Sequence, residues 1–133
     1  MLIVAIVSLA LELGCLQEYE GAASDDIVDV TDANFQQEVL QVNEPVLVEF
    51  WAPWCQPCRE MEPAIELIAQ AFSGRVKVAK MRIDENPGTV AAYKVDSPPA
   101  VIVFCNGKVY KRRLGRQDAE GLKALLSDLL TGE

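Results

Sequence analysis

Residues 50–58 read Phe-Trp-Ala-Pro-Trp-Cys-Gln-Pro-Cys, and this stretch determines how the rest of the chain is interpreted. The apolar run that leads into it, Val46–Trp51, predicts a central strand covered on both faces. After Cys58 the apolar side chains recur at helical spacing, so a helix should begin here. A strand, a tight turn carrying Cys55 and Cys58, and a helix start are typical of thiol–disulfide chemistry.

Composition limits the classes of function. The chain has 133 residues, of which 50% are hydrophobic and 24% charged, as expected for one globular domain. Its formal net charge of -8 disfavours nucleic-acid binding, which needs a basic surface. No histidine is present, which excludes Cys–His nucleophile pairs and histidine-containing metal sites. Only two of the 4 cysteines are closely spaced, which argues against a zinc site, so neither a metal nor a bound cofactor is expected.

The N-terminal segment leaves two alternatives open. Residues 1–14 read MLIVAIVSLALELG, a run shorter than the roughly 20 residues of a membrane span and without the basic start of a signal peptide. Residues 13–15, Leu-Gly-Cys, resemble a bacterial lipoprotein cleavage site. The segment is therefore either an apolar extension of a cytoplasmic protein, or a means of export or membrane anchoring through residues 1–15. Residues 1–24 are predicted to be this extension with a linker, and residues 25–133 the folded domain.

Hydrophobic spacing and turn residues predict the remaining elements. Pro63 lies inside the helix that follows Cys58, where a kink is expected. Asn106-Gly107 predicts a tight hairpin. The order of elements predicts an α/β fold, with a central mixed five-stranded sheet flanked by helices on both faces. Strands are expected over residues 27–30, 46–51, 76–83, 100–104 and 108–113. A first helix is expected to end at residue 40 and to be capped by Thr31 or Asp32. Further helices are expected over residues 58–72 and 87–93 and around 122–130.

The position of the two cysteines predicts unequal roles. Cys55 lies where the strand gives way to the helix, and unpaired N–H groups and the helix dipole there favour a thiolate. Cys58, one turn later, can attack a mixed disulfide formed by Cys55. Pro57 stiffens the turn and removes an N–H group that would otherwise need a partner. The alternative is that both cysteines are small buried core residues.

These motifs together resemble the thioredoxin family. The resemblance covers residues 25 to 131 and rests on the tryptophan- and proline-flanked cysteines, on residues 84–87 (Asp-Glu-Asn-Pro), and on Pro99, Asn106-Gly107 and Gly115. It implies a thioredoxin fold and a protein-disulfide reductase that acts on disulfide-containing proteins. It also implies a monomer and a flavin-dependent thioredoxin reductase as electron donor.

The resemblance further implies roles for individual residues. Cys55 would attack the substrate and Cys58 would resolve the mixed disulfide. Pro99 would be the cis proline facing the disulfide, and Pro63 the kink proline. Trp51 and Trp54 would pack the active-site turn, and Gly115 would be a close-approach position beside the site. Lys80 would be a lysine on the buried side of the site. Glu49 stands where thioredoxins usually carry a buried aspartate.

Glu49 is also notable without the resemblance. A carboxylate inside an apolar strand is costly unless it is hydrogen-bonded, paired or protonated. Burial should raise its pKa and make it a proton donor and acceptor near neutral pH, so we expect it to take the proton of Cys58 through a water. The alternative is a carboxylate that reaches solvent or pairs with Lys80.

Three positions depart from the family pattern. Glu49 is one methylene longer than aspartate. Gln56 replaces the usual glycine between the cysteines and, being neutral, favours a reductant. Pro98 precedes Pro99, and because proline has no N–H group, substrate binding should rely on the Pro98 carbonyl and apolar contact.

Two other classes of function remain as alternatives. One is a binding module that uses the fold as a docking surface. The presence of Cys55, Cys58 and Pro99 argues against this alternative. The other is an exported or membrane-tethered thiol reductant or isomerase. Cys105, beside the hairpin turn, is expected to be a half-buried structural cysteine rather than a regulatory thiol.

Overall fold

The computed structural model describes residues 27–131. The predictions for residues 1–24 lie outside the described residues. The chain forms one five-stranded sheet with the strand order β1-β3-β2-β4-β5. The strands are β1 (Val28–Asp29), β2 (Val46–Trp51), β3 (Lys77–Arg82), β4 (Ala100–Cys105) and β5 (Lys108–Leu114).

The sheet is mixed, and two of its three inner strands, β2 and β4, are the most apolar. β2 runs parallel to β3 and antiparallel to β4. Every residue of β2 except Trp51 is buried, and β4 is buried as far as Phe104. Apolar side chains on both faces fit a strand that is covered on both sides. The predicted strand over residues 46–51 is confirmed.

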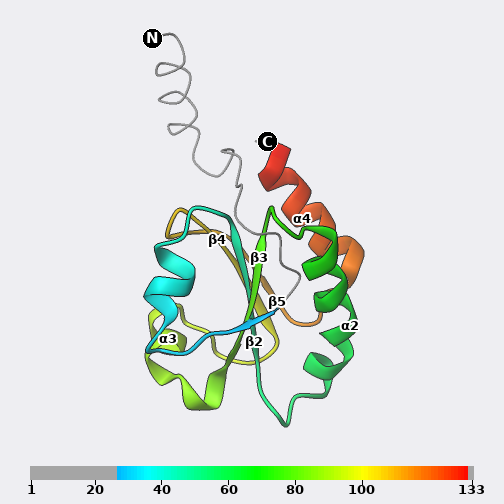
Figure 1. The fold of residues 1–133 in the computed structure, drawn as a ribbon. Coiled ribbons are helices and arrows are strands. Elements are labelled where there is room, and N and C mark those ends of the chain that lie inside the picture. Colours follow the sequence, from blue (N-terminus) through cyan, green and yellow to red (C-terminus); the bar gives the residue numbers. More distant parts are fainter. Residues whose placement is uncertain (1–26, 132–133) are drawn as a thin grey trace, which may run out of the picture.

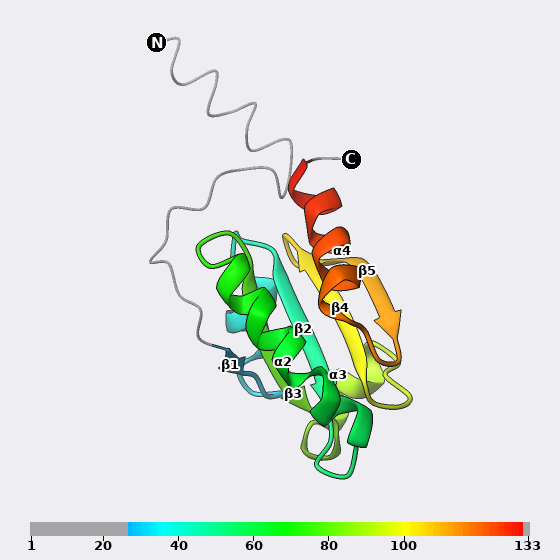
Figure 2. The ribbon, with the colours of Figure 1, turned by 90° about the vertical axis from the view of Figure 1, so that its right-hand side faces the viewer.

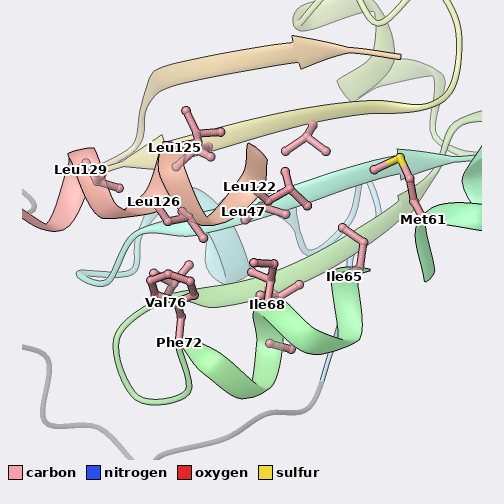
Figure 3. Packing of buried hydrophobic residues seen from close by; sticks show 14 residues of the cluster. Leu47, Met61, Ile65, Ile68, Phe72, Val76, Leu122, Leu125, Leu126 and Leu129 are labelled. Carbon is pink, nitrogen blue, oxygen red and sulfur yellow. The ribbon is translucent and has the colours of Figure 1, made fainter. Parts of the chain in front are cut away.

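Helices cover both faces of the sheet, as predicted. α2 (Gln56–Ala71) and α4 (Ala119–Thr131) pack side by side on one face, as Figures 1 and 2 show. On the other face lie η2 (Gln36–Leu40), a π-helical segment, and α3 (Pro87–Ala92) (Figure 1). Figure 3 shows the core between the first pair of helices and the sheet, which includes Leu47, Met61, Ile65, Ile68, Leu122 and Leu126.

Three aromatic rings fill the core on the opposite face. Phe35 lies 5.4 Å from Phe104 and 5.6 Å from Tyr93, measured between ring centroids. Tyr93 meets Phe104 edge-on at 5.2 Å. Such tilted and edge-to-face pairs add to the energy of burial. This cluster joins η2, the end of α3 and β4.

The hairpin between β4 and β5 forms as predicted. Asn106 and Gly107 both have positive φ angles, 51° and 78°, which a tight two-residue hairpin turn requires. A Cβ atom on Gly107 would also lie 2.9 Å from the Leu40 carbonyl oxygen, so this glycine is needed for space as well. Cys105 ends β4 half-buried.

The predicted cap of the first helix is partly correct. Thr31 caps the turn that leads into η2: its hydroxyl accepts a hydrogen bond from the backbone N–H of Asn34 at 3.3 Å, and its own N–H donates to the Asn34 side-chain oxygen at 2.7 Å. The helical segment η2 begins later, at Gln36, and has no side-chain cap of its own, and Asp32 makes other contacts. The carboxylate of Asp32 turns to α3, where it accepts hydrogen bonds from the N–H groups of Gly88 and Thr89 at 2.9 and 2.8 Å and from the Thr89 hydroxyl at 2.6 Å. These contacts, the Thr89 hydroxyl foremost, lower the pKa of Asp32. The first turn of α3 offers unpaired donors that the local sequence around Asp32 could not reveal.

Several other boundaries also differ from the predictions. β1 pairs over two residues only, alongside β3. β3 ends before Ile83, because residues Ile83–Glu85 form a short 3-10 turn, η3. α2 begins at Gln56 rather than at Cys58, so the segment between the cysteines belongs to the first turn of the helix.

Candidate active site

The two cysteines lie where β2 passes into α2. Cys55 is the N-cap residue of α2, with φ and ψ of -90° and 104°, and Pro57 stands in the first turn of the helix. The N–H group of Cys55 donates to the Ala52 carbonyl at 3.1 Å, which closes the turn after the strand. Proline is tolerated in a first helical turn, because the N–H groups there have no partner inside the helix.

Cys55 and Cys58 form a disulfide, and their Cα atoms are 5.3 Å apart. The Sγ atom of Cys55 accepts a hydrogen bond from the backbone N–H of Cys58 at 3.2 Å. This donor and the positive end of the helix dipole would stabilise a thiolate at Cys55 once the disulfide is reduced. The geometry therefore suits a pair that is repeatedly oxidised and reduced.

Exposure differs sharply around the disulfide. Cys55 and Cys58 are only 6% and 3% exposed and pack with Ala52 against the half-buried Trp51. Trp54, by contrast, is 63% exposed. Most of the Trp54 side chain is therefore open to solvent, and its packing against the turn stays a prediction. The exposed indole leaves an apolar surface beside the cysteines.

Gln56 contacts a residue that the sequence reasoning missed. The guanidinium of Arg59 donates to the Gln56 side-chain oxygen at 2.9 Å and also to the Pro53 carbonyl. Arg59, in α2, thus stabilises the loop that carries the cysteines through these two hydrogen bonds. The spacing of Gln56 and Arg59, three positions apart in a helix, was the available signal.

Glu49 is completely buried in the middle of β2. Within the described chain neither of its carboxylate oxygens has a hydrogen-bond partner. Burial raises the pKa of Glu49 to about 7; the nearby Lys80 ammonium opposes that rise, and the Glu62 carboxylate adds to it. Neither form of the alternative holds: Glu49 does not reach solvent, and it is absent from the ion pairs found among residues 27–131.

A cavity of about 160 Å³ connects Glu49 with Cys58. It has room for water, which could bridge polar groups in such a site. Lys80 stands beside Glu49 in the sheet, because the two residues are register partners in β3 and β2. Its ammonium lies 5.0 Å from the centre of the Trp51 ring. The full lining is Glu49, Trp51, Ala52, Pro53, Cys58, Arg59, Glu62 and Lys80.

The proline pair lies just before β4. The peptide bond between Pro98 and Pro99 is cis, as the resemblance to thioredoxins implies. The Pro99 carbonyl accepts a hydrogen bond from the N–H of Gly115 at 2.9 Å. Gly115 has a φ of 82°, yet a Cβ atom there would meet nothing within 4 Å. Gly115 is therefore required by its backbone conformation, because no other described residue crowds it, and its role as a close-approach position for a substrate stays a prediction.

Pro63 is not brought to the cavity. It lies inside α2 and lines a separate groove, between this helix and the start of α4. The kink at Pro63 stays a prediction. Within residues 27–131 no helix is long and apolar enough to cross a membrane, and no group of three or more candidate side chains could hold a metal ion.

A family model and individual relatives both match this chain, and they point to the same family. The family model named Thioredoxin matches residues 26–128. The chain is 48% identical over 101 residues to the thioredoxin of Alicyclobacillus acidocaldarius subsp. acidocaldarius, an alignment covering 76% of this chain and 95% of that protein. It is 41% identical over 103 residues to the thioredoxin of Pseudomonas aeruginosa, covering 77% and 95%.

A third relative, thioredoxin 1 of Synechococcus elongatus, is 51% identical over 79 residues, covering 59% of this chain and 74% of that protein. These relatives and the paired cysteines make the chain a thiol–disulfide oxidoreductase, active as a protein-disulfide reductase on disulfide substrates. The chain belongs to the thioredoxin family.

Proposed function

We propose that Cys55 is the attacking cysteine of this reductase and Cys58 the resolving one. The observation that carries the proposal is the placement of their disulfide: Cys55 caps α2 beside the exposed Trp54, whereas Cys58 lines the inner cavity with Glu49. A substrate approaching from outside would meet Cys55 first. A base in the cavity would act on Cys58.

The proposed reaction transfers two electrons in two steps. The Cys55 thiolate attacks one sulfur of the substrate disulfide, that S–S bond breaks, and the departing substrate thiolate takes up a proton. Cys58 then attacks the Cys55 sulfur of the mixed disulfide and gives its own proton to Glu49. The second substrate thiolate leaves, the substrate is reduced, and the Cys55–Cys58 disulfide has formed.

Glu49 is suited to the proton transfer for two reasons. Its carboxylate oxygens have no hydrogen-bond partner in the described chain, so they are available to a water in the cavity. Its pKa of about 7 lies near neutral pH, where a general base both accepts and releases protons readily. A mixed-disulfide resolution rate in Glu49→Gln equal to that of the wild type would exclude this role.

We also propose a substrate-binding surface made of Trp54, Pro98, Pro99 and Gly115. Trp54 offers an exposed apolar face. Both prolines lack an N–H group, and the Pro99 carbonyl already accepts from Gly115, so the Pro98 carbonyl is the proposed acceptor for the substrate backbone. Trp54→Ala should then raise KM for a protein disulfide more than it lowers kcat.

A flavin-dependent thioredoxin reductase is the proposed electron donor, and the cytoplasm the proposed compartment. Both proposals rest on membership of the thioredoxin family. Export or anchoring through residues 1–15 is the second candidate, and fractionation of cells expressing the full chain separates the two.

The central test is the reduction of insulin by dithiothreitol in the presence of the full chain. The wild type should accelerate it, and Cys55→Ser should not. With dithiothreitol left out, reduced Cys58→Ser should instead accumulate a mixed disulfide with insulin, detectable by mass spectrometry. Equal rates for the wild type and Cys55→Ser would refute the proposed roles.

A further inference from the structure

Glu49 faces charged groups on two of the three elements packed around it. β3 supplies Lys80, its partner in the register of the sheet. β4 places the apolar Val101 opposite it. The remaining charged groups, Arg59 and Glu62, come from α2 and line the same cavity, together with Cys58.

Of the two cations, Lys80 is the one whose charge lowers the pKa of Glu49. The guanidinium of Arg59 is engaged by the Gln56 side chain and the Pro53 carbonyl at the outer turn. The Lys80 ammonium lies over the Trp51 ring and makes no ion pair among those of residues 27–131. A cation held beside a buried carboxylate favours its charged form.

Two glutamates of α2 have different surroundings. The Glu60 carboxylate accepts from the Arg116 guanidinium at 2.6 Å and lines the groove toward α4. Glu62 is exposed, lines the cavity of Glu49, and belongs to none of the ion pairs between described residues. Positions two apart point to different sides of a helix, which explains the separation. Glu62 is thus the anion available to oppose Lys80.

We propose that Glu62 is a positioning residue for the resolving step: from the mouth of the cavity its carboxylate opposes the Lys80 ammonium, and the two side chains together set the charge that Glu49 carries during the reaction. This inference rests on the proposed role of Glu49 as the base for Cys58.

The proposed role of Glu62 affects the proton that passes from Cys58 to Glu49. When Cys58 attacks, its S–H bond breaks and an O–H bond forms on Glu49, directly or through a water. The buried acid must then lose this proton to solvent before the next cycle. With Lys80 alone, Glu49 would stay ionised to lower pH and be a weaker base. A like charge at the cavity mouth counteracts this, in agreement with the contribution of Glu62 to the raised pKa of Glu49.

The test follows the resolving step in the reduced, full-length protein. Dithiobis-nitrobenzoate forms a mixed disulfide with Cys55, and Cys58 then expels the second nitrothiobenzoate. Stopped-flow absorbance isolates this second step as the phase that is absent from Cys58→Ser. Its rate, measured across the neutral pH range, should rise with an apparent midpoint that belongs to Glu49 and Cys58 jointly.

Glu62→Gln should move that midpoint to lower pH by roughly 0.5 unit, with a smaller displacement at high salt because the carboxylate is exposed. Lys80→Met should move it to higher pH. Glu62→Asp keeps the charge and should restore the wild-type midpoint. Glu60→Gln is the matched control, since it removes the same charge from the same helix on the other side, and its midpoint should equal that of the wild type.

The outcomes separate this inference from the role of Glu49. If Glu62→Gln and Glu60→Gln both keep the wild-type midpoint while Glu49→Gln loses the pH dependence, Glu62 has no positioning role and Glu49 remains the base. If Glu49→Gln keeps the wild-type profile, both proposals fail. If Glu60→Gln shifts the midpoint as far as Glu62→Gln does, the effect reflects net charge and the inference is overturned.

Discussion

Replacing Glu49 by glutamine should make the oxidised protein more stable at neutral and alkaline pH. Glutamine keeps the shape of the side chain but cannot ionise, so it removes only the cost of a buried charge. Burial raises the pKa of the Glu49 carboxyl group to about 7 in the folded chain, from an ordinary value of 4.5. At about 1.4 kcal/mol per pH unit, this separation corresponds to about 3 kcal/mol of unfolding free energy.

The sign of the pH dependence of the unfolding free energy follows from proton binding to Glu49. Between 4.5 and about 7 the folded protein holds a proton on Glu49 that the unfolded chain has already released. The unfolding free energy of the wild type therefore falls as the pH rises through this window and levels off above it. The contribution of Glu49 to stability is fully present below the lower value and is lost above the upper one. Glu49→Gln lacks this dependence.

The measurement is urea denaturation of both proteins, with the disulfide intact, at several pH values. The stability gap in favour of Glu49→Gln should widen by about 2–3 kcal/mol between about pH 5 and about pH 8. Glu66→Gln, at an exposed position of α2, is the control and should show a gap independent of pH. Parallel curves for the wild type and Glu49→Gln would refute the reasoning, because they would mean that Glu49 titrates alike in both states.

Three further predictions concern the fold. Phe104→Ala should lower the unfolding free energy by about 3–5 kcal/mol in urea denaturation, since its ring packs against two others; a loss below about 1 kcal/mol would contradict this. Gly107→Ala should cost about 1–3 kcal/mol and more than Gly115→Ala, because both have positive φ but only Gly107 approaches the Leu40 carbonyl; equal losses by thermal melting would argue against it. Asp32→Ala should cost about 1 kcal/mol at neutral pH by removing the cap of α3. That loss should shrink as the pH falls through the lowered pKa of Asp32, and a loss of constant size would count against the cap.

Much of the fold follows from local patterns. The apolar run at Val46–Trp51 becomes the central strand β2, because a segment without a polar face must be buried on both sides. Asn106-Gly107 forms the hairpin, because both residues accept positive φ. Of the two candidates for the first helix cap, Asp32 was mispredicted, since it has equally good donors in α3, distant in sequence but adjacent in space.

The candidate site was predictable in its reacting atoms and less so in its surroundings. The spacing of Cys55 and Cys58 at a strand-to-helix junction was sufficient to predict the redox pair, although the helix begins two residues earlier than predicted and is capped by Cys55. The exposure of Trp54 was not predictable, because an aromatic side chain can pack inward or point outward from the same turn.

The sequence alone determined the chemistry of this protein, because a redox pair at a helix start needs only local spacing and backbone geometry. The tertiary structure decided how that chemistry is tuned. It brought Lys80 from β3 and Glu62 from α2 to one cavity beside Glu49, and left the Glu49 carboxylate buried without a hydrogen-bond partner in the described chain. Burial and charge act through space, so the pKa of Glu49 depends on neighbours that the order of residues along the chain does not reveal.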